Sequence, residues 1–189
     1  SALENVTSPA GAKGFWQFMP KTGKAYGLEI NELVDERYNL EKSTEAACKY
    51  LLKLYNQFGS WTLATAAYNM GPNALEKQLK KQKVKSYYDL KLNNETSRYI
   101  FRIIAYKLID NDPKKYGFNL EAADLYPPIK IYKMEIKKTI ENLSDFAINI
   151  NLNYKIIKYL NPWILKNKIE VKDKFYTINL PLDNSLEIK

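Results

Sequence analysis

The spacing of apolar residues between positions 43 and 58 predicts an amphipathic helix. One face of that helix collects apolar side chains three or four positions apart, namely Ala47, Leu51, Leu54 and Phe58. Ser43 is expected to cap the start of the helix, because its hydroxyl oxygen can accept hydrogen bonds from free backbone N–H groups. Gly59 follows the last apolar residue, as glycine often does at a helix end.

A shorter helix is predicted directly after it, over residues 61–70. Ser60 is expected to be its N-cap, and Gly71-Pro72 is expected to stop it. No segment in this part of the chain alternates apolar and polar residues convincingly, so the first part is predicted to be mainly α.

A longer helix is expected to begin at Asn94 or Thr96 and to end at Asp112-Pro113. Its apolar side chains recur at helical spacing and are therefore expected to face inward: Tyr99, Ile100, Ile103, Ile104, Tyr106 and Leu108.

The pattern then changes to strand, helix, helix, strand. Residues 130–140 and 175–180 alternate apolar with polar positions, whereas residues 142–150 and 153–161 have helical periodicity. Six apolar side chains of the two helices are expected to point inward: Leu143, Phe146, Ala147, Ile156, Ile157 and Leu160. So small an α+β unit builds little core of its own, so it is expected to pack against the rest of the chain.

The stiff sequence Tyr126-Pro127-Pro128 separates the two parts. Proline fixes its own φ angle and disfavours helix in the residue before it. In addition, all seven glycines lie within the first 117 residues. We therefore expect a domain over residues 1–126 and a small second domain over residues 127–189.

Composition excludes several kinds of chemistry. The 189 residues carry 29 Lys and Arg against 21 Asp and Glu, a net charge of +8, and 46% are hydrophobic, enough for a real core. There is no histidine, and Cys48 is the single cysteine. These counts exclude a Ser-His-Asp triad, a Cys-His dyad, an imidazole-ligated metal and an intrachain disulfide. No cofactor or metal is expected, so carboxylates, tyrosines, lysines and backbone amides must perform any chemistry.

The sequence gives no sign of a membrane span or an export signal. No uncharged apolar run approaches the roughly 18 residues needed to cross a bilayer. The chain begins with Ser1 and lacks a basic stretch followed by an apolar segment, which suggests a trimmed fragment. Any membrane attachment is therefore expected to lie in upstream sequence.

The densest candidate site is SPAGAKGFWQFMPKTG at residues 8–23. Its glycines and proline favour a tight turn in which the backbone approaches a ligand closely. Gln17 can donate and accept hydrogen bonds, and Trp16 offers a flat apolar face, a combination that suits sugars. The alternative is that the large apolar residues around Gln17 simply belong to the core.

Two further clusters stand out downstream. Tyr68-Asn69 presents polar groups at a predicted helix end beside Gly71, although Asn69 could equally act as a C-cap. Glu95 and Tyr99 lie one turn apart on the same helix face, where a buried tyrosine with a hydroxyl partner is the alternative interpretation.

In this order and spacing, the motifs resemble the soluble lytic transglycosylase family, most of all its membrane-bound murein transglycosylase D branch. They are SPAGAxGxWQFMPxTG at 8–23, YGL at 26–28, DER at 35–37, AAYNxG at 66–71 and ETxxY at 95–99. The resemblance implies a lysozyme-like fold. It also implies cleavage of the β-1,4 bond between N-acetylmuramic acid and N-acetylglucosamine in peptidoglycan, with closure of the product to a 1,6-anhydro sugar.

The resemblance also implies roles for particular residues. The family's catalytic glutamate would stand immediately before Ser1, so no catalytic acid is expected in this chain, and Glu4 is interpreted as a surface residue. Ser1 and Tyr99 would flank and orient that acid. Four residues would contact substrate: Ser8, Gln17, Tyr68 and Asn69. The chain is then expected to bind glycan without cleaving it.

The second part resembles a LysM-like glycan-binding module through its strand and helix order and through two segments, residues 143–147 and 156–163. The usual Gly-Asp-Thr near the first turn is replaced by Lys138-Thr139-Ile140. A packing appendage without glycan binding is the alternative. The resemblance implies a location in the bacterial cell envelope, in the periplasm or at the outer membrane.

Other functions remain as alternatives. A non-catalytic peptidoglycan-binding or scaffold protein is expected if the native sequence also lacks the glutamate. Six lysines between residues 77 and 91 form a basic cluster that could attract anionic peptidoglycan, although a solvated helix explains most of them. Nucleic acid is not an expected partner, because the chain has only three arginines and no nucleic-acid-binding signature.

Overall fold

The computed structural model describes residues 6–182. The chain forms two compact units: residues 1–47 together with 128–189, and residues 48–127. The first boundary falls inside helix α2 (Leu40–Phe58), and the second falls between two prolines. Each unit is described by itself below. The division of the chain into domains 1–126 and 127–189 stays a prediction.

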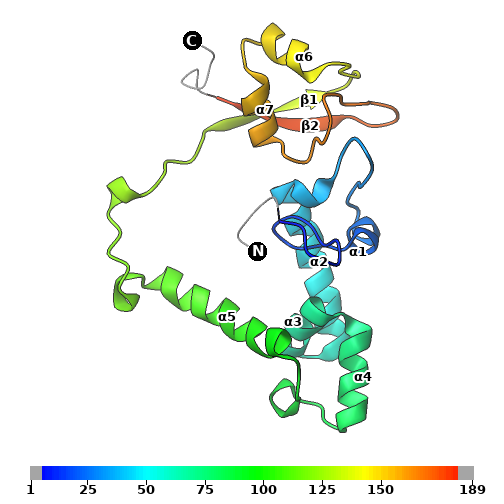
Figure 1. The fold of residues 1–189 in the computed structure, drawn as a ribbon, viewed down its shortest axis with the longest axis vertical. Helices are drawn as coiled ribbons and strands as arrows, with labels where there is room; N and C mark the ends of the chain where they lie inside the picture. The colour runs from blue at the N-terminus through cyan, green and yellow to red at the C-terminus, as the bar shows by residue number, and fades with distance from the viewer. Residues whose placement is uncertain (1–5, 183–189) are drawn as a thin grey trace. The chain divides into compact units, whose positions relative to one another are not determined.

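The carboxyl-terminal part of the first unit is a two-stranded sheet with two helices. Strand β1 (Ile131–Ile136) pairs antiparallel with β2 (Tyr176–Pro181), with Ile136 opposite Tyr176. Helices α6 (Leu143–Asn149) and α7 (Tyr154–Leu160) lie between the strands in sequence (Figure 1). This strand, helix, helix, strand order confirms the prediction from periodicity. We call residues 128–182 the LysM-like module.

The amino-terminal part of the first unit is mostly loop. It contains helix α1 (Pro20–Ala25), the short 3-10 helix η1 (Glu36–Tyr38) and the first turns of α2. Val34 from this part is 1% exposed and belongs to the same apolar core as residues of the LysM-like module. The expectation that the module packs against its neighbour is confirmed. The expectation that the module builds little core of its own is wrong, because apart from Val34 the described residues buried in this core all come from the module. The module residues buried in this core include Leu143, Ala147, Ile157, Trp163, Ile164, Ile169, Ile178 and Leu180.

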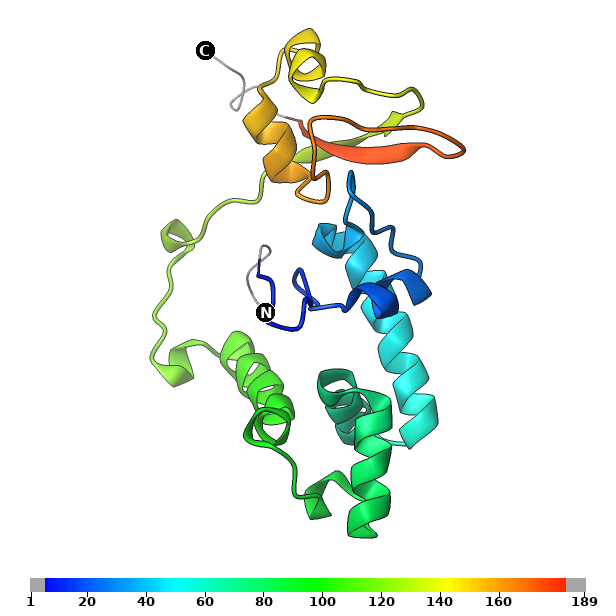
Figure 2. The same ribbon diagram turned by 45° about the vertical axis from the view of Figure 1, so that its right-hand side comes forward.

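The second unit is helical. Helix α3 (Trp61–Met70) contacts both α4 (Pro72–Gln82) and α5 (Asn94–Asn111), and Figure 2 shows these helices adjacent to one another. Alanines on α3 allow the close approach, and the core of the unit comprises Leu54, Leu63, Ala64, Ala66, Ala67, Leu75 and Tyr87. Short 3-10 turns follow at η2 (Tyr87–Asp89), η3 (Lys114–Tyr116) and η4 (Ala122–Asp124). The mainly α fold with a small sheet is therefore confirmed.

Helix caps show where local chemistry decides the element boundaries. The Ser60 hydroxyl accepts a hydrogen bond from the Leu63 N–H at 3.3 Å, and Gly71 ends α3 at φ 89°, both as predicted. The prediction that Ser43 starts α2 is wrong, because the helix begins at Leu40. Asn39 supplies the cap, since its side-chain oxygen accepts a hydrogen bond from the Lys42 N–H at 3.1 Å.

The inward face predicted for α5 is only partly confirmed. Tyr99 and Ile100 are half-buried, but the four apolar residues predicted to follow them on this face are exposed. The exposed fractions are 47% for Ile103, 46% for Ile104, 74% for Tyr106 and 49% for Leu108. Apolar periodicity identifies the apolar face of a helix, but it does not determine whether another element covers that face.

Among residues 6–182, no helix is both long and apolar enough to cross a membrane.

Candidate functional site

The loop over residues 8–18 carries two of the predicted site residues and is closed by its own hydrogen bonds. The Ser8 N–H donates to the Ala12 carbonyl and the Ser8 hydroxyl accepts from the Ala12 N–H, both at 2.9 Å. At the other end, the Lys13 N–H donates to the Phe18 carbonyl at 3.2 Å. Ser8 therefore holds the turn, and its hydroxyl hydrogen remains a potential donor. We call residues 8–18 the substrate loop, after the substrate contacts that the resemblance implies for Ser8 and Gln17.

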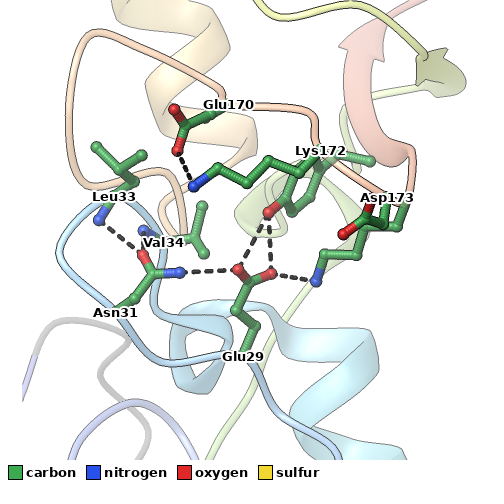
Figure 3. A pocket seen from close by; sticks show the side chains of 9 residues that line it. Glu29, Asn31, Leu33, Val34, Glu170, Lys172 and Asp173 are labelled. Atoms are coloured by element: carbon green, nitrogen blue, oxygen red, sulfur yellow. Dashed lines mark hydrogen bonds and ion pairs between the residues drawn. The ribbon is translucent and has the colours of Figure 1, made fainter.

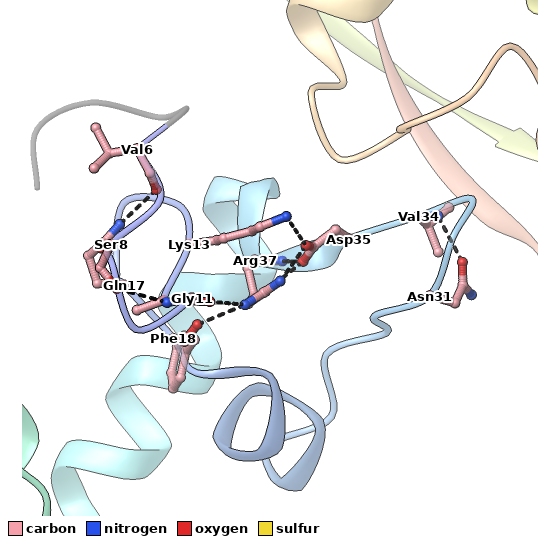
Figure 4. Close-up of polar contacts among 11 residues, drawn as sticks. Val6, Ser8, Gly11, Lys13, Gln17, Phe18, Asn31, Val34, Asp35 and Arg37 are labelled. Carbon is pink, nitrogen blue, oxygen red and sulfur yellow. Dashed lines mark hydrogen bonds and ion pairs between the residues drawn. The ribbon is translucent and has the colours of Figure 1, made fainter.

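Gln17 is built into this loop through its amide nitrogen. Its backbone has φ 50°, which is uncommon for a residue other than glycine. The side-chain Nε2 donates to the Gly14 carbonyl at 2.7 Å and to the Val6 carbonyl at 3.0 Å (Figure 4). Both amide hydrogens are used in this way, so a ligand would meet the amide oxygen.

The apolar residues beside Gln17 do not share one environment. Phe18 is 2% exposed and Met19 is 42% exposed, whereas Trp16 is half-buried. The Trp16 Nε1 donates to the Thr44 hydroxyl at 2.8 Å, which fixes the loop to α2. The core interpretation therefore holds for Phe18 but not for the whole segment.

A buried arginine holds the substrate loop through hydrogen bonds to two of its backbone carbonyls. Arg37 is 3% exposed, and its Nη1 donates to the carbonyls of Gly11 and Phe18 at 3.0 and 3.1 Å. Its Nε and Nη2 donate to the two carboxylate oxygens of Asp35 at 2.8 and 2.6 Å (Figure 4). This two-point ion pair satisfies a charge that burial would otherwise penalise heavily. Lys13 adds a second, longer contact to Asp35 at 3.9 Å.

The backbone of the Arg37 segment also lies directly against the loop. A Cβ atom built on Gly14 would lie 2.0 Å from the Arg37 carbonyl oxygen. Gly14 also has φ 74°, a left-handed conformation that favours glycine. Residue 14 is therefore a glycine for two independent reasons.

A pocket of about 360 Å³ lies within the first unit, between residues 29–34 and 170–176 (Figure 3). Glu29 at its wall accepts hydrogen bonds from the Tyr176 hydroxyl at 3.0 and 3.1 Å and from the Lys174 ammonium group. Burial, and then the bond to Glu29, raises the pKa of Tyr176. Lys172 and Glu170 form a further ion pair at 3.2 Å. Glu29 therefore joins the two walls of the pocket through Tyr176 and Lys174, whereas Lys172 and Glu170 lie on the same wall.

The second unit contains the other predicted contacts. Asn69, near the end of α3, accepts a hydrogen bond from the Thr96 hydroxyl at 2.8 Å and donates to Glu95 at 3.2 Å. Both partners lie in the first turn of α5. Gly71, rather than Asn69, ends α3, so Asn69 serves to orient α5 against α3.

Tyr68 lies among other aromatic hydroxyl groups. Its ring centroid lies 5.4 Å from that of Tyr50. Burial, then Tyr99 and Tyr50, raises the pKa of Tyr68. Burial, then Glu95, raises the pKa of Tyr99. Both hydroxyl groups are therefore protonated at neutral pH and can donate hydrogen bonds.

The structure thus groups Ser8 with Gln17 in the first unit, and Tyr68 with Asn69 and Tyr99 in the second. Ser1 and Glu4 lie outside the described residues. Their roles, like the substrate contacts, remain predictions. Sequence reasoning assigned no role to Arg37 or Asp35. The sequence feature that could have indicated their role is the run of three charged residues at 35–37, which belongs to the family motif. All three residues are buried.

Two family models match the chain. Residues 1–91 match the transglycosylase SLT domain, and residues 132–184 match the soluble lytic transglycosylase C-terminal LysM-like domain.

Curated relatives agree with these matches. Membrane-bound lytic murein transglycosylase D of Escherichia coli (strain K-12) is 35% identical over 125 residues, which is 64% of this chain and 28% of the relative. The protein of the same name from Escherichia coli O6:H1 gives the same values. A putative tributyltin chloride resistance protein of an Alteromonas species is 36% identical over 61 residues, 32% of this chain and 30% of the relative. The chain thus spans less than a third of each relative. It carries a transglycosylase SLT domain followed by a LysM-like domain of the soluble lytic transglycosylases, and it is a homologue of membrane-bound lytic murein transglycosylase D.

Proposed function

We propose that this chain is the glycan-binding part of a peptidoglycan lytic transglycosylase in the bacterial cell envelope, periplasmic or associated with the outer membrane. The observation that carries the proposal is the SLT match over residues 1–91, which includes the substrate loop and Tyr68-Asn69. The reaction would cleave the β-1,4 bond between N-acetylmuramic acid and N-acetylglucosamine. It would leave a 1,6-anhydro end and would consume no water.

One carboxylic acid suffices for this chemistry. In an apolar cleft its pKa is raised, so the acid is protonated at neutral pH and can donate to the leaving glycosidic oxygen. The resulting carboxylate then takes the proton of the substrate's own 6-hydroxyl, whose oxygen attacks the anomeric carbon. Ordinary glycosidases need a second carboxylate because water or an enzyme group is their nucleophile. We propose that this acid is the glutamate preceding Ser1 and that Ser1 and Tyr99 orient it.

The proposed substrate contacts are those that the family resemblance implies, and the hydrogen-bonding capacity of each side chain is compatible with its contact. The amide oxygen of Gln17 would accept a hydrogen bond from a sugar hydroxyl or an acetamide N–H group, since the described contacts of its side chain use only the amide nitrogen. Tyr68 is protonated at neutral pH, as tyrosine ordinarily is, and burial raises its pKa further, so its hydroxyl would donate to an acceptor on the sugar. Ser8 and Asn69 would complete the polar contacts, while also holding the substrate loop and α5 in place.

Mass spectrometry of peptidoglycan digests tests the reaction. Residues 1–189 are expected to release no product, whereas the chain extended upstream by the glutamate is expected to release muropeptides with 1,6-anhydro ends. Products from residues 1–189 would contradict the position of the acid. Hydrated reducing ends from the extended chain would contradict the lyase chemistry.

A binding experiment separates this proposal from a non-catalytic scaffold protein. If the extended chain binds glycan but releases nothing, the protein is a peptidoglycan-binding protein rather than an enzyme. Gln17→Ala is expected to weaken glycan binding, with the glutamate-extended chain as the reference. An unchanged affinity combined with a lowered melting temperature would show that Gln17 serves only to hold the loop.

A further inference from the structure

One segment of the first unit is bonded on both of its sides. Residues 29–37, which we call the connecting segment, lie between the substrate loop and the LysM-like module. On the loop side, Arg37 donates to the carbonyls of Gly11 and Phe18 (Figure 4). Its guanidinium is fixed in turn by the carboxylate of Asp35, two residues earlier.

On the module side, the same few residues pair with the chain that follows α7. The Asp35 N–H donates to the Trp163 carbonyl at 2.9 Å, and the Leu165 N–H donates to the Leu33 carbonyl at 2.8 Å. Val34, between these two bonds, forms an antiparallel bridge with Ile164, and both side chains are fully buried. Asp35 is thus bonded to the module through its backbone and to Arg37 through its side chain.

A second set of contacts joins the segment to the first residue of β2 and to the loop before it. Glu29 binds Tyr176 and Lys174 of the module (Figure 3). Glu29 also pairs with Glu36: the Glu36 N–H donates to the Glu29 carbonyl and the Glu29 N–H donates to the Glu36 carboxylate, both at 2.8 Å. The module therefore contacts the connecting segment at its first residue, Glu29, and again at residues 33–35.

We propose that the LysM-like module is a structural support of the substrate loop and that Arg37 is the positioning residue through which it acts. The structural part of this inference is independent of the proposed function. Its consequence for glycan binding rests on the proposed contact between the loop and glycan. A module joined to its neighbour by a flexible tether would share few contacts with it. Here the module supplies backbone partners, a shared core and charged contacts to the residues that flank Arg37. Displacement of Asp35 would move the guanidinium and release two loop carbonyls at once.

The first test removes one backbone donor at the contact. Leu165→Pro loses the N–H that binds the Leu33 carbonyl, whereas Leu165→Ala keeps it and changes only a partly exposed side chain. Amide hydrogen exchange of residues 8–18 is expected to be about tenfold faster in the proline variant than in the alanine variant. Amides of β2 are expected to exchange equally in both. Equal loop exchange in the two variants would overturn the proposal.

A second variant tests the proposal if Leu165→Pro loses protection from hydrogen exchange throughout the chain. Tyr176→Phe removes only the hydroxyl that binds Glu29 and keeps the buried ring. Faster exchange in residues 8–18, with the melting temperature unchanged, supports the proposal. Unchanged loop exchange overturns it.

Binding of a β-1,4-linked N-acetylglucosamine tetramer supplies an independent measurement. A weaker affinity in Leu165→Pro than in Leu165→Ala, at equal melting temperature, is the expected result. Equal affinities would overturn the role of the module in glycan binding. If neither the unchanged chain nor any variant binds the tetramer, the proposed function fails for this ligand. The hydrogen-exchange measurements then still test whether the module supports the loop.

Discussion

Gly14 occupies a position where a side chain has no room. The Arg37 carbonyl oxygen would lie 2.0 Å from an added Cβ, and φ is 74°. Gly14→Ala is therefore expected to lower the free energy of unfolding by more than about 2 kcal/mol, because strain and a steric clash add. Gly11→Ala is the matched control, since Gly11 also has positive φ but an added Cβ meets open space. Chemical denaturation of both variants measures the difference, and equal losses would contradict the close approach.

Tyr68 makes stability depend on pH in the alkaline range. Burial, then Tyr99 and Tyr50, raises the pKa of Tyr68, so the folded state keeps its proton where the unfolded chain loses it. The stability that Tyr68 contributes is fully present below pH about 10 and is lost as the pH rises further, by up to about 1.4 kcal/mol per pH unit.

Tyr68→Phe is therefore expected to flatten the decline in the free energy of unfolding between pH about 10 and 11.5. Tyr126→Phe, at a side chain that is 98% exposed, serves as the control. Urea denaturation at several pH values gives the slope. A slope that Tyr68→Phe leaves unchanged would show that this hydroxyl titrates alike in both states.

At the scale of elements, the two halves of α5 differ in what holds them. Its first turn is capped by Asn93, whose side-chain oxygen accepts from the Thr96 N–H at 2.8 Å, and it is bonded to α3 through Asn69. The second half has apolar side chains that remain exposed. Tertiary packing therefore stabilises the start of α5 and contributes little to its end.

Substitutions in the second unit are expected to reveal this contrast. Ile104→Lys, at a side chain that is 46% exposed, is expected to change the free energy of unfolding by less than about 0.5 kcal/mol. Leu75→Ala, at a side chain with no exposed surface, is expected to cost about 2–5 kcal/mol. Thermal and chemical unfolding measure both. A large loss from Ile104→Lys would mean that the apolar face of α5 is covered in solution.

Local patterns predicted the elements well where the controlling residue is a sequence neighbour. Ser60 and Gly71 bound α3 as expected, because a cap acts within a few residues. The predicted N-cap Ser43 is wrong, because Asn39 offers an equivalent side-chain oxygen four residues earlier. Sequence alone does not show which of the two residues caps the helix.

The candidate site was less predictable, because its contacts join distant positions. The residue types at Ser8 and Gln17 marked the loop, but the partners of Arg37 lie 19 and 26 residues away. Glu29 and Tyr176 are separated by 147 residues. Periodicity carries no information at such separations, so the buried Asp35–Arg37 pair and its neighbours became apparent only in three dimensions.

At the scale of the molecule, the first unit depends on both ends of the chain. Residues 1–126 without the LysM-like module would expose Val34 and lose the backbone partners of Leu33 and Asp35. We expect amides of residues 8–38 to lose protection from hydrogen exchange in that truncated chain, while amides of α3 stay protected. Retained protection in residues 8–38 would show that the amino-terminal part folds without the module.

The order of the segments along the chain has a consequence for biosynthesis. Residues 48–127 are contiguous and can fold as soon as they leave the ribosome. Residues 1–47 are made before this middle segment, yet their core partners around Trp163 and Ile178 are made after it. At usual translation rates this leaves them without their partners for on the order of ten seconds. A nascent chain therefore completes the unit that contains residues 6–47 after the unit formed by residues 48–127.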